Sequence, residues 1–141
     1  MTATIAAESA GVLLLIENHA DALWRDTISC DRVLTSVSSP AVAFSFNPAH
    51  FAHVGEHPFL ATYKRARAKR YTEQLMLIDG CTPPWPGYTL LAQGQGEVRE
   101  LMSILRCRSF AGHFTICLKD LRGAESFACQ AAEFWRSLDL M

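Results

Sequence analysis

The chain has 141 residues, half of them hydrophobic, so it is long enough to bury a sizeable core as a single domain over residues 1–141. Thirteen basic and fourteen acidic residues leave a formal net charge of -1, which supplies no general field to attract nucleic acid. No apolar run approaches the roughly 18 residues that a membrane span requires, and the N-terminus lacks the basic and long apolar segments of a secretory signal.

Four short apolar runs, each followed by polar or turn-forming residues, predict four strands. The runs lie near residues 11–17, 41–46, 74–78 and 114–118. They are continuous rather than alternating, which is typical of strands that are buried on both faces.

Segments with apolar residues at helical spacing follow each run, as at Val98, Leu101, Met102 and Leu105. Residues 2–10 could be the tail of one more helix. Strands that alternate with amphipathic helices at intervals of roughly thirty residues predict an α/β fold, with parallel strands joined by right-handed crossovers.

The stretch 80–96 (GCTPPWPGYTLLAQGQG), after the third run, is too rich in proline and glycine to predict a regular element. A loop of this length in a compact domain is often functional. Trp85 stands among its prolines, where it could cover a ligand or pack on the prolines and stiffen the loop.

The basic run 64–70 (KRARAKR) is compatible with a nucleic-acid contact or with the solvent face of a helix. Interleaved alanines and the near-neutral chain favour the helix face, so nucleic acid is not an expected partner.

Five cysteines are scattered without a CxxC pair, and an odd number would leave one thiol unpaired in an oxidising compartment. Reduced thiols are the simpler interpretation. We therefore expect a cytoplasmic protein with no membrane-inserted segment.

Residues at the carboxyl ends of the four expected strands are the first place to look for a site, because loops converge there in parallel α/β folds. These ends carry carboxylates, amides, imidazoles and a thiol: Glu17, Asn18, His19, Asn47, His50, Gln74, Asp79 and Cys117. Such a set could hold a divalent metal, although the same residue types are common in loops.

Two of these patterns have plainer interpretations. His50, His53 and His57 suggest a metal cluster, yet a glycine and a proline between them break any common helix face, so we favour His50 alone in a pocket. Cys117 is more consistent with a buried strand thiol than with a nucleophile, because no neighbouring base is evident.

Five segments, in order, are GVLLLIENHAD, SSPAVAFSFNPAHF, EQLMLIDG, QGQGEVRELMSILR and FAGHFTICLKD. Together they resemble the C-terminal half of the xylose isomerase-like TIM barrels, the sugar-phosphate isomerase/epimerase group that also includes endonuclease IV. The resemblance spans nearly the whole chain. It implies four consecutive βα units, equivalent to half of a (β/α)8 barrel, which typically has about 250 residues.

The resemblance also implies a site. Family members bind Mn, Mg, Co or Zn through a carboxylate, an Asp, a His and a Glu from four successive strands, and these positions fall here on Glu17, Asn47, Gln74 and Cys117. Asn47 in place of the Asp and Cys117 in place of the Glu remove two formal charges, and Gln74 in place of the His removes one strong metal donor. We expect no metal, or at most a weak divalent-metal site at Glu17, Asn47, His50 and Gln74.

By the same resemblance, Glu17 and Cys117 occupy catalytic positions. Residues expected to line a pocket for a small polyhydroxy ligand are Asn18, His19, His50, Asp79 and Trp85. The implied function is that of a degenerate sugar isomerase/epimerase-like half-barrel, which, if active, would isomerise or epimerise a sugar or a related polyhydroxy compound. The alternative is a non-enzymatic binding or regulatory protein that uses the pocket mouth or the exposed sheet edges.

Four parallel strands leave two open edges, and unpaired edges attract further strands. We therefore expect either a homodimer or a partner chain that completes the barrel.

Overall fold

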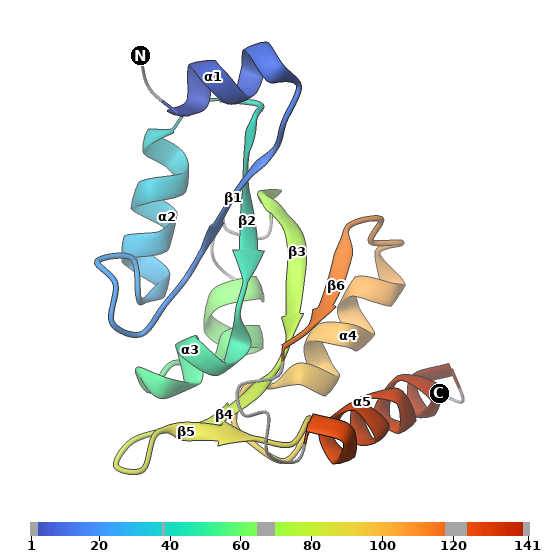
Figure 1. Ribbon diagram of the computed structural model, residues 1–141. Coiled ribbons are helices and arrows are strands. Elements are labelled where there is room, and N and C mark those ends of the chain that lie inside the picture. The colour runs from blue at the N-terminus through green and yellow to red at the C-terminus, as the bar shows by residue number, and fades with distance from the viewer. Residues whose placement is uncertain (1–2, 38, 65–69, 118–123, 140–141) are drawn as a thin grey trace.

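Strands and helices alternate along the chain in the computed structural model, which describes residues 3–37, 39–64, 70–117 and 124–139 (Figure 1). In chain order the elements are α1 (Ala3–Ala10), β1 (Leu14–Glu17), α2 (Thr27–Ser36), β2 (Val42–Phe46), α3 (Pro48–His53), the π-helix η1 (Pro58–Tyr63), β3 (Thr72–Leu77), β4 (Asp79–Cys81), β5 (Gly87–Thr89), α4 (Val98–Cys107), β6 (His113–Ile116) and α5 (Ala124–Asp139).

Four of these strands form one parallel sheet in the order β1-β2-β3-β6. Each strand pairs with the strand of the preceding βα unit, and the register sets Glu17 opposite Ser45 and Ser45 opposite Gln74. The predicted α/β class and the parallel pairing in chain order are therefore confirmed.

The observed strands are slightly displaced from the predicted runs. The first is Leu14–Glu17 rather than 11–17, because Gly11 takes a positive φ of 63° and its N–H donates to the carbonyl of Glu8, which ends α1. The fourth is His113–Ile116 rather than 114–118, and residue 118 lies outside the described residues.

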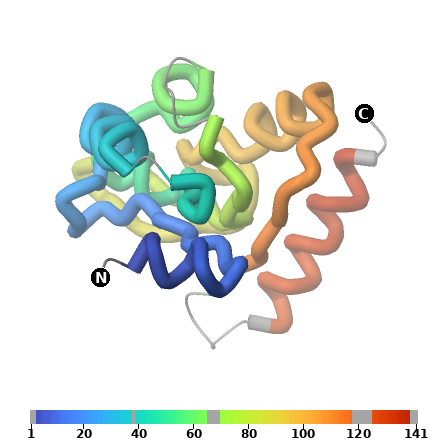
Figure 2. Tube along the Cα trace, turned by 90° about the horizontal axis from the view of Figure 1, so that it is seen from above, coloured from blue at the N-terminus to red at the C-terminus, as the bar shows by residue number. Residues whose placement is uncertain are grey.

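Three helices, α2, η1 and α4, lie along one face of the sheet, and α5 lies beyond β6 (Figure 2). By contrast, α1 lies at the amino-terminal ends of β1 and β2 (Figure 1). The face that the three helices cover carries Phe44, Phe46, Leu75 and Leu77, each at most 2% exposed, and they share a core with helix residues such as Leu101. Burying a side chain of this size contributes about 1.5–3 kcal/mol, so this layer holds the domain together.

The opposite face of the sheet is the one that a closed barrel would enclose. Alternation along the strands assigns to it Leu15 and Glu17 of β1, Ser45 of β2, and Gln74 and Met76 of β3. Leu15 is 39% exposed and Leu13, which precedes it on the same face, is 45% exposed. We call this surface the open face.

The expectation that residues 80–96 form no regular element is wrong in part. β4 and β5 form an antiparallel hairpin, with Asp79 opposite Thr89 and Cys81 opposite Gly87. The hairpin packs against α3, and this tertiary contact is not visible in the local composition.

Two other segments bear on the predictions. Of the basic run 64–70, residues 65–69 lie outside the described residues. Within the ranges that the structure describes, none of the helices combines the length and apolar character needed to cross a lipid bilayer.

Candidate functional site

The carboxyl ends of β1 and β2 meet at one corner of the sheet, beside α3 and the β4–β5 hairpin (Figure 1). Glu17 and Asn18 end β1, and Asn47 follows β2 directly. Asn18 joins the two strand ends: its Nδ2 donates to the carbonyl of Asn47 over 2.9 Å, and its Oδ1 accepts from the Asn47 N–H over 2.8 Å. Both asparagines are fully buried, so this corner is rigid.

The Asn47 side chain occupies the centre of the corner. Its Nδ2 donates to Oε1 of Glu17 over 2.7 Å, and its Oδ1 accepts from the His50 N–H over 3.3 Å. Asn47 is the N-cap of α3, with Pro48 in the first turn, a combination that favours helix initiation. The carboxylate of Glu17 needs a hydrogen-bond donor and the His50 N–H needs an acceptor. These two contacts therefore determine the orientation of the Asn47 amide.

Three histidines and a tyrosine continue from this corner, and we call His19, His50, His53 and Tyr88 the aromatic wall. The His19 and His50 ring centroids are 4.0 Å apart, and His53 lies 5.6 Å from His50 and 4.8 Å from Tyr88. Buried His50 accepts from the Ala20 N–H at Nδ1, whereas the side chain of His19 is 48% exposed. His19 is thus the imidazole of the wall that a ligand could reach most easily.

A second set of polar contacts crosses the open face. Ser45 donates to Oε1 of Gln74 over 2.8 Å, and Nε2 of Gln74 contacts the hydroxyl of Thr115 over 2.6 Å. Cys117 follows β6, and its N–H donates to the Leu77 carbonyl. Both ends of the Gln74 amide are therefore occupied by protein hydroxyls.

These contacts do not fit a divalent cation. Asn47 turns its NH2 group toward Glu17, and its oxygen already serves the helix cap. The oxygen of Gln74 accepts from Ser45. Among the residues that the structure describes, no group of three or more His, Cys, Asp or Glu side chains is arranged to hold a metal ion. A hard cation requires several anionic or carbonyl oxygens aimed at one point, and the described residues of this corner do not present such a set.

Asp79 is the first residue of β4 and is fully buried. Its carboxylate accepts from the N–H groups of Gly80, Gly94 and Gly96, at 2.8, 3.1 and 2.8 Å. An added Cβ at Gly96 would lie 2.6 Å from Oδ1 of Asp79, so the backbone can approach this carboxylate only without a side chain. These contacts give Asp79 a role in shaping the loop beside the site.

Trp85 lies between β4 and β5 and is 83% exposed, so it is not buried against the neighbouring prolines. The structure thus brings Asn18, His19 and His50 to one corner with Glu17. Asp79 is the first residue of the hairpin, and Trp85 lies exposed between its two strands.

Sequence reasoning missed a second carboxylate that organises the neighbouring loops. Oε2 of Glu97 accepts from the N–H groups of Phe59 and Leu60 at the start of η1, and Oε1 lies 3.1 Å from Nδ1 of His57. His57 is therefore paired away from His50 and His53, and the three do not form one cluster. No local pattern links Glu97 to a helix 38 residues earlier in the chain.

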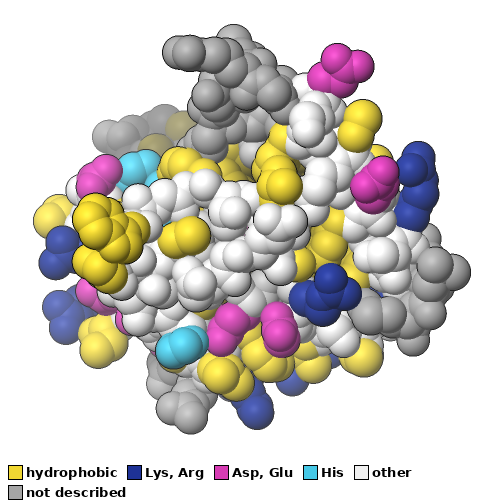
Figure 3. Space-filling model, turned by 90° about the horizontal axis from the view of Figure 1, so that it is seen from below, with side chains coloured by type: hydrophobic (Ala, Val, Ile, Leu, Met, Phe, Trp, Pro, Cys, Tyr) yellow, Lys and Arg dark blue, Asp and Glu magenta, His cyan; other side chains and the backbone are white. Residues whose placement is uncertain are grey.

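The end of the molecule that carries the strand ends is shown in Figure 3. Its centre is largely covered by backbone and uncharged polar side chains, and most of the charged side chains of the described residues lie toward its margin. The described surface at this end thus provides no concentrated positive field for a nucleic acid.

Comparisons with known proteins support the fold. No protein-family model and no curated protein matches the chain. A xylose isomerase domain protein from Planctomyces limnophilus superposes with a TM-score of 0.78 at 17% identity, covering 96% of this chain and 48% of that one. The probable 3-DHS dehydratase AsbF from Bacillus anthracis, involved in petrobactin synthesis, gives 0.74 at 11% identity, covering 90% and 50%. The chain thus has the fold of half a TIM barrel, and it spans about half the length of each of these chains.

Proposed function

We propose that this chain is a sugar isomerase/epimerase-like half-barrel that binds a small polyhydroxy ligand without the divalent metal of the family it resembles. The observation that carries the proposal is the Asn47 amide, whose nitrogen donates to Glu17 and whose oxygen caps α3. The position where the resemblance implies a metal ligand is here a neutral amide that donates to a carboxylate.

The chemistry of this corner suits hydroxyl groups. Asn47 contacts one oxygen of Glu17, and a ligand hydroxyl could donate to the other. Half-exposed His19 offers an imidazole edge, and the rings of the aromatic wall give an apolar surface for the C–H face of a sugar. A few polar groups beside an apolar wall is the usual composition of a small-molecule site.

Binding, and not turnover, is the proposal for the single chain. Glu17 is the last residue of β1, and Cys117 directly follows β6. These two strands are the edges of the sheet. The resemblance sets a carboxylate at each of these two positions, whereas here one of them is a thiol. The single chain thus offers one carboxylate, Glu17, and not a pair that could move a proton on two sides of a sugar.

The test is a titration of the chain with pentoses, hexoses and their phosphates in EDTA, followed by calorimetry and by amide chemical shifts. We expect saturable binding of at least one compound, with shifts concentrated at Glu17, Asn47 and His19. His19→Ala should weaken binding several-fold, whereas His57→Ala, a histidine paired with Glu97 elsewhere, should not. Binding only after Mn²⁺ is added would contradict the proposal.

A second candidate is a non-enzymatic protein that binds another protein through the open face. The exposure of Leu13 and Leu15 favours it, since large apolar side chains grouped on one sheet face mark an interaction surface. A chain that binds no compound in the titration but associates through this face would fit this second function.

A further inference from the structure

We infer that a second copy of this chain covers the open face and closes an eight-stranded barrel around a two-fold axis parallel to the strands. In this assembly β6 of each copy would pair with β1 of the other. The use of the closed barrel as a ligand pocket rests on the proposed function, whereas the assembly itself does not.

The two sheet edges are compatible with this pairing. β1 and β6 each have four residues, and each has a strand neighbour on one side only in the described sheet. Rotation about an axis parallel to the strands keeps their direction, so β6 of one copy meets β1 of the other in the parallel sense found throughout the sheet. The same β6–β1 contact would form twice in the dimer, so the eight strands would close into a barrel with no free edge.

The surface area agrees with a missing partner. A compact monomer of 15.6 kDa exposes about 7,300 Å². This chain exposes 8306 Å². The excess of about 1,000 Å² is close to the roughly 800 Å² that each partner buries in a stable interface.

The open face is suited to meet a copy of itself. Its amino-terminal half carries exposed Leu13 and Leu15, and its carboxyl-terminal half carries half-buried Glu17 and Gln74, with Ser45 buried between them. A two-fold axis along the strands keeps each residue at its own height, so apolar side chains would face apolar ones and polar side chains would face polar ones. Glu17 is the one acid among the residues named here, which limits like-charge repulsion.

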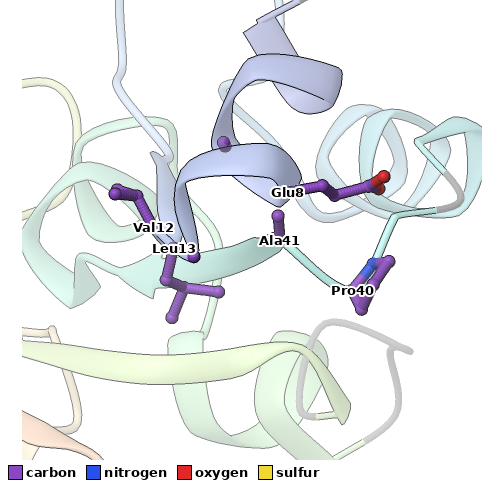
Figure 4. Close-up of a pocket in the computed structure, with 7 residues that line it drawn as sticks. Glu8, Val12, Leu13, Pro40 and Ala41 are labelled. Atoms are coloured by element: carbon purple, nitrogen blue, oxygen red, sulfur yellow. The ribbon is translucent and has the colours of Figure 1, made fainter.

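A hollow of about 400 Å³ lies at the amino-terminal ends of β1 and β2. Val12 and Leu13, Pro40 and Ala41, and Glu8 of α1 surround it (Figure 4). The second copy's β6 would begin next to this end of β1.

The closed assembly changes the candidate site. Within one copy Glu17 and Cys117 belong to the first and last strands of the sheet. In the dimer Glu17 of one copy and Cys117 of the other follow adjacent strands, about 4.8 Å apart. Each copy would keep its own corner at Glu17, and the closed wall would bring Cys117 of the other copy beside it.

Crosslinking tests this arrangement. Glu17→Cys, oxidised or treated with a short bis-maleimide, should give a covalent dimer through Cys117 of the second copy. The matched control Glu17→Cys with Cys117→Ser should not, and neither should Leu23→Cys, whose residue is 91% exposed in the loop after β1. A crosslinked product of single-chain mass, or dimers that form equally in the controls, would overturn the inference.

The mass of the unmodified chain in solution is the second measurement. Light scattering at tens of micromolar should give twice the mass of one chain, and Leu15→Lys should give a monomer while Leu23→Lys remains dimeric. A monomeric unmodified chain would overturn the inference even if sugars bind, and a dimer that binds no sugar would overturn the proposed function alone. If Leu15→Lys does not fold, the crosslinking result decides.

Discussion

Asn47 combines two contacts that a carboxylate at the same position would not make together. It donates to Glu17 and accepts from the first turn of α3. An aspartate could still cap the helix, but it would bring a second negative charge within hydrogen-bonding distance of Glu17. The amide thus allows the strand end and the helix start to lie together without a cation.

The first prediction is that Asn47→Asp destabilises the fold by about 1–3 kcal/mol at pH 7, because it replaces a hydrogen bond with repulsion. The loss should shrink as the pH falls and one carboxyl of the pair is protonated. Urea denaturation at pH 7 and pH 4 measures both effects.

Glu17→Gln combined with Asn47→Asp is the matched control, since it restores one donor facing one carboxylate. It should recover most of the stability at pH 7. A double variant no more stable than Asn47→Asp would show that the Glu17–Asn47 contact contributes little.

Sequence reasoning could find some of these residues and not others. The ends of the apolar runs located Glu17, Asn18 and Asn47, because a strand end can be predicted to within a few residues. The Gln74 contacts could not be predicted, since Gln74 is 29 residues from Ser45 and 41 residues from Thr115 in the chain. Only the strand register joins them.

The start of α2 shows how local chemistry defines an element. Asp26 accepts from the Ser29 N–H over 2.8 Å while the Ser29 hydroxyl accepts from the Asp26 N–H, forming a capping box. The hydrogen bond from the Ser29 backbone, followed by that from its hydroxyl, holds the pKa of Asp26 below its ordinary value.

The second prediction follows from the lowered pKa of Asp26. A lowered pKa in the folded state stabilises the fold above the unfolded value, about 3.9, and the contribution is lost as the pH falls through the folded value. Asp26→Ala should cost about 1 kcal/mol at pH 7 and less in acid. Asp26→Asn should cost little at pH 7, since Asn also caps helices. Urea midpoints of each variant at pH 7 and in acid measure how the loss of stability depends on pH. An Asp26→Ala loss that is the same at both would contradict a role for the Asp26 charge.

The third prediction concerns the loop that Asp79 holds. Gly96→Ala should destabilise the chain by about 1–3 kcal/mol, because the new Cβ would lie 2.6 Å from Oδ1 of Asp79. Gly87→Ala is the control, since nothing lies within 4 Å of its added Cβ, and its effect should stay within about 0.5 kcal/mol. Equal urea midpoints for the two variants would contradict the packing argument.

Elements with strong periodicity were predicted well and short ones were not. The apolar spacing from Val98 to Leu105 predicted a helix, and α4 spans Val98–Cys107. The three-residue strands β4 and β5 have no such period: β4 packs against α3, and β5 pairs with β4. The six-residue helix α3 also escaped prediction, although Asn47 and Pro48 are a recognisable start signal.

At the scale of the whole molecule, the fourth prediction is that metal binding requires the complete ligand set. Asn47→Asp, Gln74→His and Cys117→Glu together should raise Mn²⁺ affinity by at least about tenfold, or 1.4 kcal/mol, provided that a second half completes the barrel. Each single substitution should do little, because hard-metal affinity depends on ligand number and charge. Calorimetric titration measures this, and a single variant that binds as tightly as the triple would contradict it.

The strand order β1-β2-β3-β6 also has a kinetic consequence. Each strand of this sheet pairs with the sheet strand that precedes it in the chain, so the sheet can grow by successive addition, at rates intermediate between those of helical bundles and β-sandwiches. The outer edges of β1 and β6 stay unpaired while the sheet of one chain forms. A contact between copies through these edges can only form afterwards. Refolding monitored by tryptophan fluorescence should therefore show a phase independent of protein concentration and then one that accelerates with it, whereas a single concentration-independent phase would indicate that folding ends with the individual chain.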